Sequence, residues 1–519
     1  MRFRRALLFA LSAGLALPVA ASAHPVQIVS LEQTLGNATA ALTSPPNDGG
    51  ANFATSRNLK LLGFSEHRVA PNDFNRFNTD LAFWGDKAFQ GQFNGFRILD
   101  VDNPRRPREL LNFEGCGSGA NGGQGDVVVW GSILVRAWDV NAGANQTCDG
   151  QVVPPGFEGM HVFDVSDTQN PELVASVDLR CGTHTLTAVP DLGNRRLLVY
   201  GTPSPASNNS EPQCHGLDIV EVPLSRPEES EFLHFEFAGR NQADALPFRC
   251  HDTGVILGRA NKASCAGGAG FAVWSLGGKD GGSRDNPRFL YNHVVPEIRD
   301  ENPPNFDNPT GHSAAFSYDG ETIIFGHEPG GGLQSRCKAT GEPLTGGANA
   351  GPGVQSDDMK SFFFFETDSG MPQGKWTHTR PQTEIENCTL HNYDIVPTKH
   401  DDILVHGSYQ SGIGVLDFSN RANAREIAFA DPAPLPLTST GGTQDGGDWS
   451  SYFYNGIIYE ADITRGLFTW QLDDRDTERA YKLRHLNPQT QEFTIGAKRD
   501  NHRWNDDDRW HDDRWDDRD

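Results

Sequence analysis

The sequence predicts an all-β protein, a seven-bladed β-propeller whose blades are four-stranded antiparallel sheets. The first observation is a strand-like segment that recurs seven times, beginning at residues 95, 159, 216, 270, 361, 412 and 466. The second is the stretch Cys388–Ala430, in which one copy stands third among four short β-branched and aromatic runs bounded by Gly, Pro, Asn and Asp. The third is that no convincing helical periodicity follows Met1–Ala23.

The recurring segments are the expected third strands of the blades, at a repeat of about 54 residues with loop insertions. They are GFRILDV (Gly95–Val101), GMHVFDV (Gly159–Val165), GLDIVEV (Gly216–Val222), GFAVWSL (Gly270–Leu276), SFFFFET (Ser361–Thr367), GIGVLDF (Gly412–Phe418) and GLFTWQL (Gly466–Leu472). The blades are expected at about Arg68–Asn112, Cys116–Leu179, Cys181–Phe237, Cys250–Val295, Gly311–Arg380, Cys388–Ala430 and Asp448–His485. Either Asn58–Ser65 or Tyr481–His485 supplies the strand that closes the ring.

The ends of the chain differ in composition from the repeats, and they divide it into four regions. Residues 1–23 have the three parts of a secretory signal: an Arg-rich start, an apolar middle and a small-residue cleavage site at Ala21–Ala23. Residues 24–57 are expected to form an irregular lead-in, and 58–490 the propeller. Residues 498–519 are an Arg/Asp/Trp-rich tail without an apolar run, which is expected to be disordered.

Composition narrows the partners and the compartment. The formal net charge of −24 argues against nucleic acid and anionic membrane surfaces, because both require a basic patch. After the signal no segment is long and apolar enough for a membrane span. The expected location is outside the cytoplasm, in the periplasm, on the cell surface or in the medium.

The eight cysteines fit an oxidising compartment. Four stand just before the first strand of a blade and four stand at or beyond the end of a second strand. Those two places lie at the same end of an antiparallel blade, so pairing is sterically plausible. The expected disulfides are Cys116–Cys148, Cys181–Cys214, Cys250–Cys265 and Cys337–Cys388.

The third-strand pattern, with an Asn-Pro turn after two early copies (Asn103-Pro104 and Asn170-Pro171), resembles the LVIVD-repeat proteins, a bacterial group of extracytoplasmic propellers. The similarity covers roughly Asn58–Asp474. Its more distinctive stretches are Gly311–Gly332, Asn387–Phe418 and Asp448–Leu467. The resemblance implies a fold and a compartment, and no defined activity.

Propeller geometry indicates where a site would form. The first strand of each blade starts, and the second strand ends, at the same mouth of the central channel, so residues at these positions converge. The first-strand starts bring His184, His251, Asp252, His312, His391 and Trp449. The second-strand ends bring Arg136, Asp139, Tyr200, His327, Glu328, His406, Tyr409, Glu460, Asp462 and Arg465.

Two interpretations of this mouth remain open. Four histidines on consecutive blades, His184, His251, His312 and His391, could hold Fe, Cu or Zn, with Glu328, Glu460 or Asp462 orienting the rings. Alternatively, the histidines cap strands, and arginine and aromatic side chains bind an anionic or sugar-like ligand. The sequence lacks the Gly-x-Ser-x-Gly motif of serine hydrolases.

The sequence therefore predicts an exported binding or scaffold protein that acts through its axial mouth, with an unknown small molecule or protein as partner. The alternative is a metal-dependent oxidoreductase or hydrolase with a four-histidine axial site.

Overall fold

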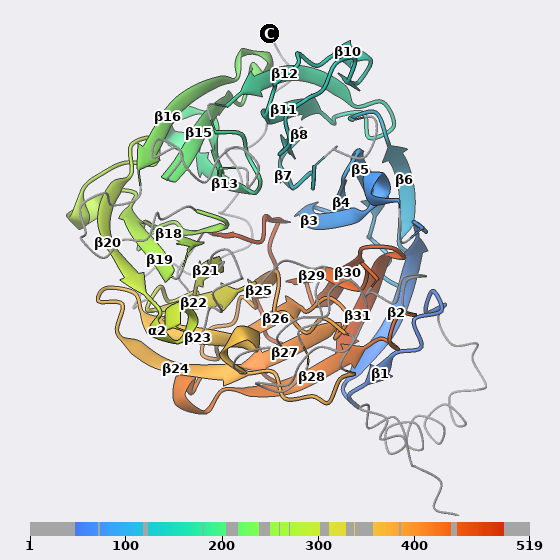
Figure 1. Ribbon diagram of the computed structural model, residues 1–519, viewed down its shortest axis with the longest axis vertical. Coiled ribbons are helices and arrows are strands. Elements are labelled where there is room, and N and C mark those ends of the chain that lie inside the picture. The colour runs from blue at the N-terminus through green and yellow to red at the C-terminus, as the bar shows by residue number, and fades with distance from the viewer. Residues whose placement is uncertain are drawn as a thin grey trace, which may run out of the picture.

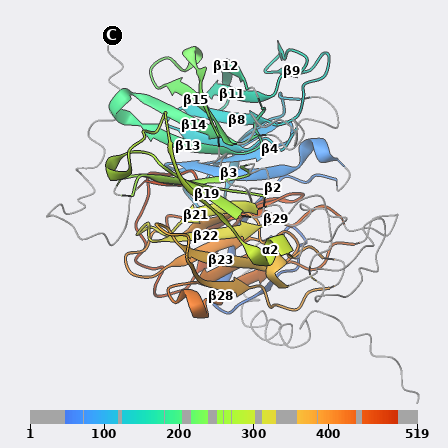
Figure 2. The ribbon, with the colours of Figure 1, turned by 60° about the vertical axis from the view of Figure 1, so that its left-hand side comes forward.

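The computed structural model describes residues 47–70, 73–117, 123–179, 181–203, 216–237, 250–258, 260–268, 270–300, 311–328, 337, 357–383, 386–436 and 444–492. Seven antiparallel sheets stand around a central channel (Figure 1), which confirms the predicted seven-bladed propeller. In the turned view of Figure 2, the sheets of neighbouring blades lie side by side around the ring.

In each blade the strand nearest the channel comes first, and its partners follow outward. Blade one contains β3 (Asn78–Trp84), β4 (Lys87–Gln92), β5 (Gly95–Asp100) and β6 (Arg108–Phe113). Blade two contains β7 (Val127–Trp130), β8 (Ile133–Trp138), β11 (Gly159–Asp164) and β12 (Glu172–Asp178), with the small hairpin β9 (Thr147–Cys148) and β10 (Gln151–Val152) inserted. Blade three contains β13 (Leu186–Asp191), β14 (Arg196–Gly201), β15 (Gly216–Pro223) and β16 (Glu231–Phe237). Blade four contains β17 (Thr253–Ile256), β18 (Lys262–Gly267), β19 (Gly270–Ser275) and β20 (Arg288–Val294).

The last three blades follow the same order. Blade five contains β21 (Gly311–Phe316), β22 (Thr322–His327), β23 (Ser361–Glu366) and β24 (Pro372–Thr377). Blade six contains β25 (Tyr393–Ile395), β26 (Ile403–Gly407), β27 (Ile413–Asp417) and β28 (Arg425–Asp431), with β1 (Ala54–Thr55) added outside. Blade seven contains β29 (Asp448–Tyr454), β30 (Ile457–Asp462), β31 (Gly466–Leu472) and, as its outer strand, β2 (Leu59–Glu66).

The glycine that begins most of the recurring segments has a steric cause. A Cβ atom on Gly95, Gly159 or Gly270 would lie 1.7, 2.0 or 1.9 Å from a carbonyl oxygen of the adjacent outer strand. No side chain fits in that space, so the close approach of the third and fourth strands requires glycine. Each blade also has a register shift between these two strands, a bulge that increases the local twist.

The hydrophobic core consists of seven clusters, one between each pair of neighbouring blades. Strands inside a blade are covered on both faces and are therefore apolar on both faces, as in Ile133–Trp138, where every residue is buried. The tryptophans Trp138, Trp274 and Trp470 are among the largest fully buried side chains. The core thus fixes the angle between blades and keeps the channel at the centre.

Both ends of the described chain help to close the ring. The outer strand of blade seven is β2, so the first of the two predicted closing segments is the correct one. The other segment leads instead into the channel (Figure 1). There β32 (His485–Leu486) pairs with the end of β3, and β33 (Thr490–Gln491) pairs in parallel with the end of β17. We call His485–Gln491 the channel segment.

The channel segment contacts four blades in succession. Between the two strand pairings, the Asn487 side chain bonds both the N–H and the C=O of Val129 in blade two, at 2.8 and 2.9 Å. The Thr490 hydroxyl donates to Ala188 O in blade three at 2.6 Å. Because first strands start at the histidine mouth and end at the opposite side, this segment lies across the far end of the channel.

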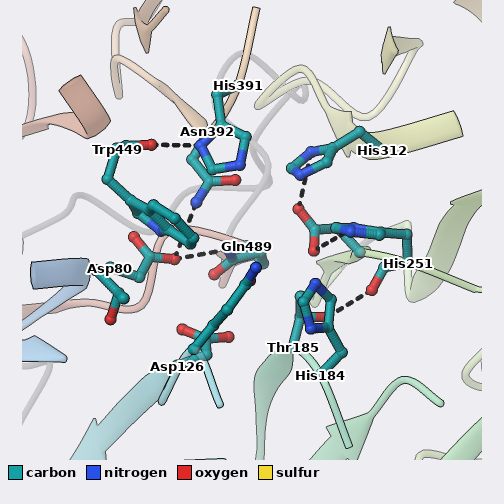
Figure 3. A pocket seen from close by; sticks show the side chains of 13 residues that line it. Asp80, Asp126, His184, Thr185, His251, His312, His391, Asn392, Trp449 and Gln489 are labelled. Atoms are coloured by element: carbon teal, nitrogen blue, oxygen red, sulfur yellow. Dashed lines mark hydrogen bonds and ion pairs between the residues drawn. The ribbon is translucent and has the colours of Figure 1, made fainter. Parts of the chain in front are cut away.

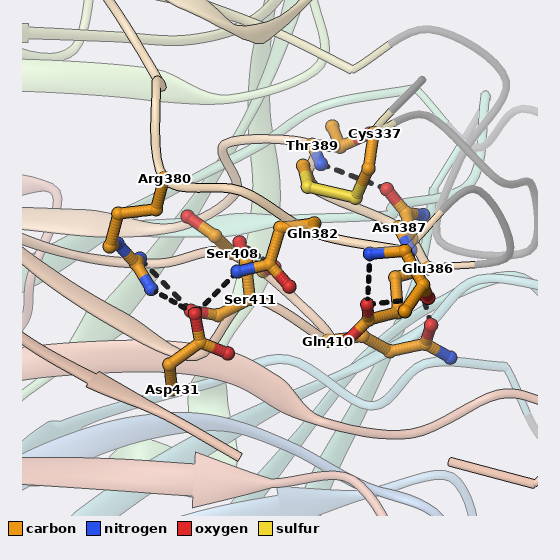
Figure 4. The surroundings of a disulfide bond; sticks show 12 residues. Cys337, Arg380, Gln382, Glu386, Asn387, Thr389, Ser408, Gln410, Ser411 and Asp431 are labelled. Carbon is orange, nitrogen blue, oxygen red and sulfur yellow. Dashed lines mark hydrogen bonds and ion pairs between the residues drawn. A yellow bond between two sulfur atoms is a disulfide. The ribbon is translucent and has the colours of Figure 1, made fainter. Parts of the chain in front are cut away.

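Three predicted disulfides are present: Cys116–Cys148, Cys250–Cys265 and Cys337–Cys388. Cys181 is also disulfide-bonded, while Cys214, its predicted partner, lies outside the described residues. The bond at Cys388 anchors the segment that leads to His391 (Figure 4).

Hydrogen bonds fix that segment further. Glu386 accepts from Thr383, and Gln410 accepts from the N–H of Asn387 at 3.1 Å.

Helices are few. The described residues contain one short α-helix, α2 (Pro296–Asp300), and the 3-10 turns η1 (Phe74–Arg76), η2 (Leu192–Asn194), η4 (Pro227–Glu229), η5 (Gly278–Asp280), η8 (Asp357–Lys360) and η9 (Arg421–Asn423). None of the helices in this part of the chain is long and apolar enough to cross a membrane. The predicted signal segment, most of the lead-in and the C-terminal tail lie outside the described residues.

Candidate functional site

A pocket lies on the channel axis between the histidine mouth and the channel segment (Figure 3). It encloses about 300 Å³ free of protein atoms, including space open to solvent. All seven blades and the channel segment contribute to it. Its lining residues are Thr79, Asp80, Gln124, Asp126, His184, Thr185, His251, Asp252, His312, His391, Asn392, Trp449 and Gln489.

The four predicted histidines reach this pocket from equivalent backbone positions. The N–H groups of His184, His251 and His391 each donate to a carbonyl near the end of the second strand of their own blade, at 2.8, 2.7 and 2.9 Å. His312 follows Gly311, whose register partner is the last residue of β22. The repeated fold therefore directs one imidazole per blade toward the axis from blades three to six.

The rings form a continuous arc. Their centroids are 4.7 Å apart for His184 and His251, 4.1 Å for His251 and His312, and 4.5 Å for His312 and His391. Among the described residues, two sets of possible metal ligands each offer one donor atom per residue within 4.8 Å of the others. One set is His251, Asp252 and His312, and the other is His312, Glu328 and His391. His312 belongs to both, and His184 belongs to neither.

Neighbouring groups hold three of the rings through Nδ1. His184 Nδ1 lies 2.8 Å from a carboxylate oxygen of Asp139, and His391 Nδ1 lies 2.5 Å from the backbone oxygen of Trp449. His312 Nδ1 lies 2.6 Å from the hydroxyl of Ser313. Such partners are typical of metal-binding histidines, because they fix the tautomer and turn Nε2 toward the ion.

Glu328 enters from the end of the second strand of blade five and faces two imidazoles. Its carboxylate oxygens lie 3.6 Å from His312 Nε2 and 3.7 Å from His391 Nε2. The hydroxyl of Tyr409 donates to the same carboxylate at 2.5 Å. This side of the pocket is therefore a buried set of nitrogen and oxygen acceptors.

Burial and mutual repulsion govern the charge of the histidines. Burial and the neighbouring imidazoles hold the pKa of His312 well below its usual value. Burial also lowers the pKa of His391, although Glu328 opposes the effect. For His251 burial is the largest single influence and lowers the pKa, but Asp252 and Glu328 outweigh it and the net pKa is raised. His312 and His391 are consequently neutral at physiological pH, the form that binds metals.

The opposite wall of the pocket is acidic. Asp80 Oδ1 accepts from the N–H of Leu81 and from the hydroxyl of Tyr452, while Oδ2 lies 3.5 Å from the amide nitrogen of Asn392 and 3.4 Å from that of Gln489. Burial, opposed by these hydrogen bonds, raises the pKa of Asp80 to about 6.

Asp126 stands beside this carboxyl group in blade two. It accepts from the N–H groups of Val127 and Leu186 at 2.7 and 2.6 Å. Burial, together with the charge of Asp80, raises its pKa well above the usual value. No Lys or Arg side chain is among the described residues that line the pocket.

The structure separates the predicted second-strand residues into two groups. Asp139, Glu328 and Tyr409, which come just after their strands, reach the histidines directly. Residues within the strands do not line the pocket; these are Arg136, Tyr200, His327, His406, Glu460 and Asp462. Arg465 follows its strand but bonds Asp462 and does not line the pocket either. Side chains inside a second strand point between the blades, because only the loop beyond the strand reaches the mouth.

The partners of these buried side chains show the same separation. Arg136 donates to four backbone carbonyls, and the hydroxyl of Tyr200 donates to the carbonyl of Arg284. Further bonds join His406 to Ser408, Glu460 to Trp470 and Asp462 to Arg465. Glu460 and Asp462 therefore do not orient the histidine rings.

The sequence interpretation missed several pocket residues, chiefly Asp80, Asp126 and Gln489. Asp126 has a usable signal, because it directly precedes its first strand just as Asp252 precedes β17. Asp80 lies inside an irregular part of β3, where the register shifts between Asn78 and Leu81. Gln489 belongs to the channel segment, whose position has no signal in the local sequence.

No protein-family model matches the chain, and no curated protein matches its sequence. Among solved structures, the computationally designed Ika8 protein is similar at 10% identity and a TM-score of 0.39, covering 78% of this chain and 100% of that one. Raptor of Chaetomium thermophilum is similar at 11% identity and a TM-score of 0.42, covering 79% of this chain and 30% of that one. The resemblance to LVIVD-repeat proteins thus stays a prediction, and the assignment of a β-propeller rests on the seven sheets of the structure itself.

Proposed function

We propose that the axial pocket binds a divalent transition-metal ion, Fe, Cu or Zn, through imidazoles of the arc His184, His251, His312 and His391. The propeller fold supports a binding or scaffold role in general. The observation that carries the finer proposal is the convergence of these rings at 4.1–4.7 Å, with their Nδ1 atoms held by other groups at three of the four positions. Imidazole nitrogen is a favoured ligand of these three metals.

The alternative is that the pocket binds a small polar ligand without metal. The observation in its favour is the wall formed by Asp80, Asp126 and the ring of Trp449, which supplies hydrogen-bonding groups and an aromatic surface. This wall does not explain why four imidazoles share the other side. The metal interpretation accounts for the orientation of the rings, whose Nδ1 atoms are held by other groups at three of the four positions.

We further infer that the protein is exported, in keeping with the secretory signal in residues 1–23 and the disulfide bonds. N-terminal sequencing of the protein from the periplasm or the medium tests this. Export predicts a new N-terminus at His24, whereas an intact Met1 in the cytoplasm would contradict it.

Elemental analysis tests the metal proposal. The mature protein is purified from its export route without chelator, beside a variant with His251→Ala and His312→Ala. The proposal predicts about one Fe, Cu or Zn per chain in the native protein and none in the variant. Absence of metal from both proteins, together with unchanged thermal stability when each metal is added, would contradict it.

A further inference from the structure

The hydrogen bonds around His391 fix the position of its proton. Its Nδ1 lies 2.5 Å from the backbone oxygen of Trp449. A carbonyl oxygen can only accept, so Nδ1 carries the hydrogen. In the neutral ring the lone pair is therefore on Nε2, the atom that lies 3.7 Å from Glu328 Oε1.

The same reasoning applies to His312. The hydroxyl of Ser313 lies 3.1 Å from a carboxylate oxygen of Asp252, which can only accept, and 2.6 Å from His312 Nδ1. We therefore assign the hydroxyl hydrogen to the bond with Asp252 and the ring hydrogen to His312 Nδ1. The lone pair of the neutral His312 ring is again on Nε2, which lies 3.6 Å from Glu328 Oε2.

Three acceptors thus face one another in a buried space. The side chains of His312, Glu328 and His391 are 2%, 9% and 4% exposed, and acceptors that face each other away from water repel unless a cation lies between them. Atoms bound to one transition-metal ion at about 2.1 Å are roughly 3.0–3.4 Å apart in octahedral or tetrahedral geometry. The two imidazole-to-carboxylate separations, 3.6 and 3.7 Å, exceed this by a few tenths of an ångström, and one donor atom from each of the three residues lies within 4.8 Å of the others. A local contraction of the side chains therefore brings the three groups onto one ion.

We propose that Glu328 is itself a metal ligand, and that the ion is bound by Nε2 of His312, Nε2 of His391 and the carboxylate of Glu328. This assignment rests on the proposed function, that the pocket holds a metal. Three protein ligands, two imidazoles and one carboxylate, leave coordination positions open for water or for an oxygen-donor substrate. Such a centre suits Fe²⁺ or Zn²⁺, and its two histidines line the pocket.

The assignment differs from an axial four-histidine centre in the role of His184. The ring of His184 is held by Asp139 and stands outside both sets of converging ligand atoms. Tyr409 has a supporting role, because its hydroxyl holds the carboxylate of Glu328 in place. The two arrangements therefore predict opposite effects of substitutions at Glu328 and His184.

Titration calorimetry of the whole disulfide-bonded protein, stripped of metal, separates them. The titrants are Zn²⁺ and, without oxygen, Fe²⁺. The variants are Glu328→Gln, His184→Ala and the control Glu460→Gln, which keeps an acceptor for Trp470. We expect Glu328→Gln to lower the affinity at least about 100-fold, more than loss of an outer partner would. His184→Ala and Glu460→Gln should stay within about threefold of the native protein.

The opposite result, a large loss for His184→Ala with Glu328→Gln within about threefold of the native protein, would overturn the ligand assignment and leave a four-histidine centre. A native protein that binds neither of these ions, nor Cu²⁺ in the same titration, would instead refute the proposed function itself. Thermal melts confirm that each variant is folded. Should Glu328→Gln fail to fold, Glu328→Asp keeps the charge and withdraws the carboxylate by one bond. We expect that variant to lose at least about tenfold in affinity, and unchanged affinity would contradict the assignment.

Discussion

The axial pocket has two sides that come from different blades of the ring and differ in chemistry. The histidine side consists of His184, His251, His312 and His391 from blades three to six, and the acidic side consists of Asp80 and Asp126 from blades one and two. On the histidine side, partners hold Nδ1 of three rings and neutral Nε2 atoms face a carboxylate at blades five and six.

On the acidic side, backbone N–H groups hold both carboxyl groups, and burial raises their pKa values. The comparison shows that the propeller fixes where side chains converge, while the residue at each position decides whether that part of the ring attracts a cation or retains a proton.

The largest expected difference between the sides concerns metal affinity. His312→Ala removes the residue shared by both converging sets and should lower Zn²⁺ or Fe²⁺ affinity at least about 100-fold. Native protein at a metal concentration of 100 times Kd gains about 2.7 kcal/mol of stability, and the variant should lose this gain. Asp126→Asn on the acidic side should stay within about threefold of native affinity, and equal losses for both variants would remove the distinction between the sides.

The second prediction concerns the pH dependence of the acidic side. Because the pKa of Asp80 is about 6 when folded and 3.8 as the ordinary value, the unfolded state releases the proton first as pH rises. The contribution of Asp80 to the free energy of unfolding is therefore largest below about pH 4. It falls by roughly 3 kcal/mol as the pH rises from about 4 to about 6. Asp80→Asn should abolish that part of the decline in urea unfolding of the metal-free protein. If the decline is the same in the variant, burial does not raise the pKa of Asp80, and the prediction is wrong.

The third prediction concerns the channel segment, which forms the floor shared by both sides. Asn487→Ala leaves the N–H and C=O of Val129 without their partner in a buried strand, which should cost about 2–4 kcal/mol of unfolding free energy. The control Asn194→Ala removes an exposed side-chain bond to Asp191 and should change stability by about 0.5 kcal/mol or less. Similar small values for both variants would mean that the segment is not anchored as described.

The smallest expected effect is at Trp449, between the two sides. Its backbone oxygen, not its ring, holds His391, and the ring contacts the imidazole edge to face at 4.9 Å. Trp449→Phe keeps the backbone bond and an aromatic contact, so metal affinity should change by about threefold or less, equivalent to about 0.7 kcal/mol. A loss of tenfold or more in calorimetry would show that the indole ring itself participates in binding.

The fold could be predicted from the sequence because one steric requirement repeats in nearly every blade. Glycine at the start of the third strand is required by the outer strand, and the apolar residues after it fill the clusters between blades. The ring closure could be predicted only to within two segments, Asn58–Ser65 and Tyr481–His485, because β2 and β31 lie far apart in the chain and neither sequence encodes its partner.

The site could be predicted in part. The histidines stand directly before or within the first strands, where a single residue per blade is fixed by backbone bonds. Second-strand positions are harder to predict, since an error of a few residues moves a side chain from the mouth to the space between blades, as the pair Arg136 and Asp139 shows. The channel segment was missed because its sequence, His-Leu-Asn-Pro-Gln-Thr-Gln, has no strand pattern and the segment depends on distant blades for its bonds.

Anomalous X-ray diffraction from crystals of the metal-loaded protein tests the central claim most directly, because it locates the ion. The account predicts one peak in the axial pocket within about 2.0–2.3 Å of Nε2 of His312, Nε2 of His391 and a carboxylate oxygen of Glu328. A peak bound by His184 and His251 instead, or no peak in the pocket at full metal loading, would contradict it.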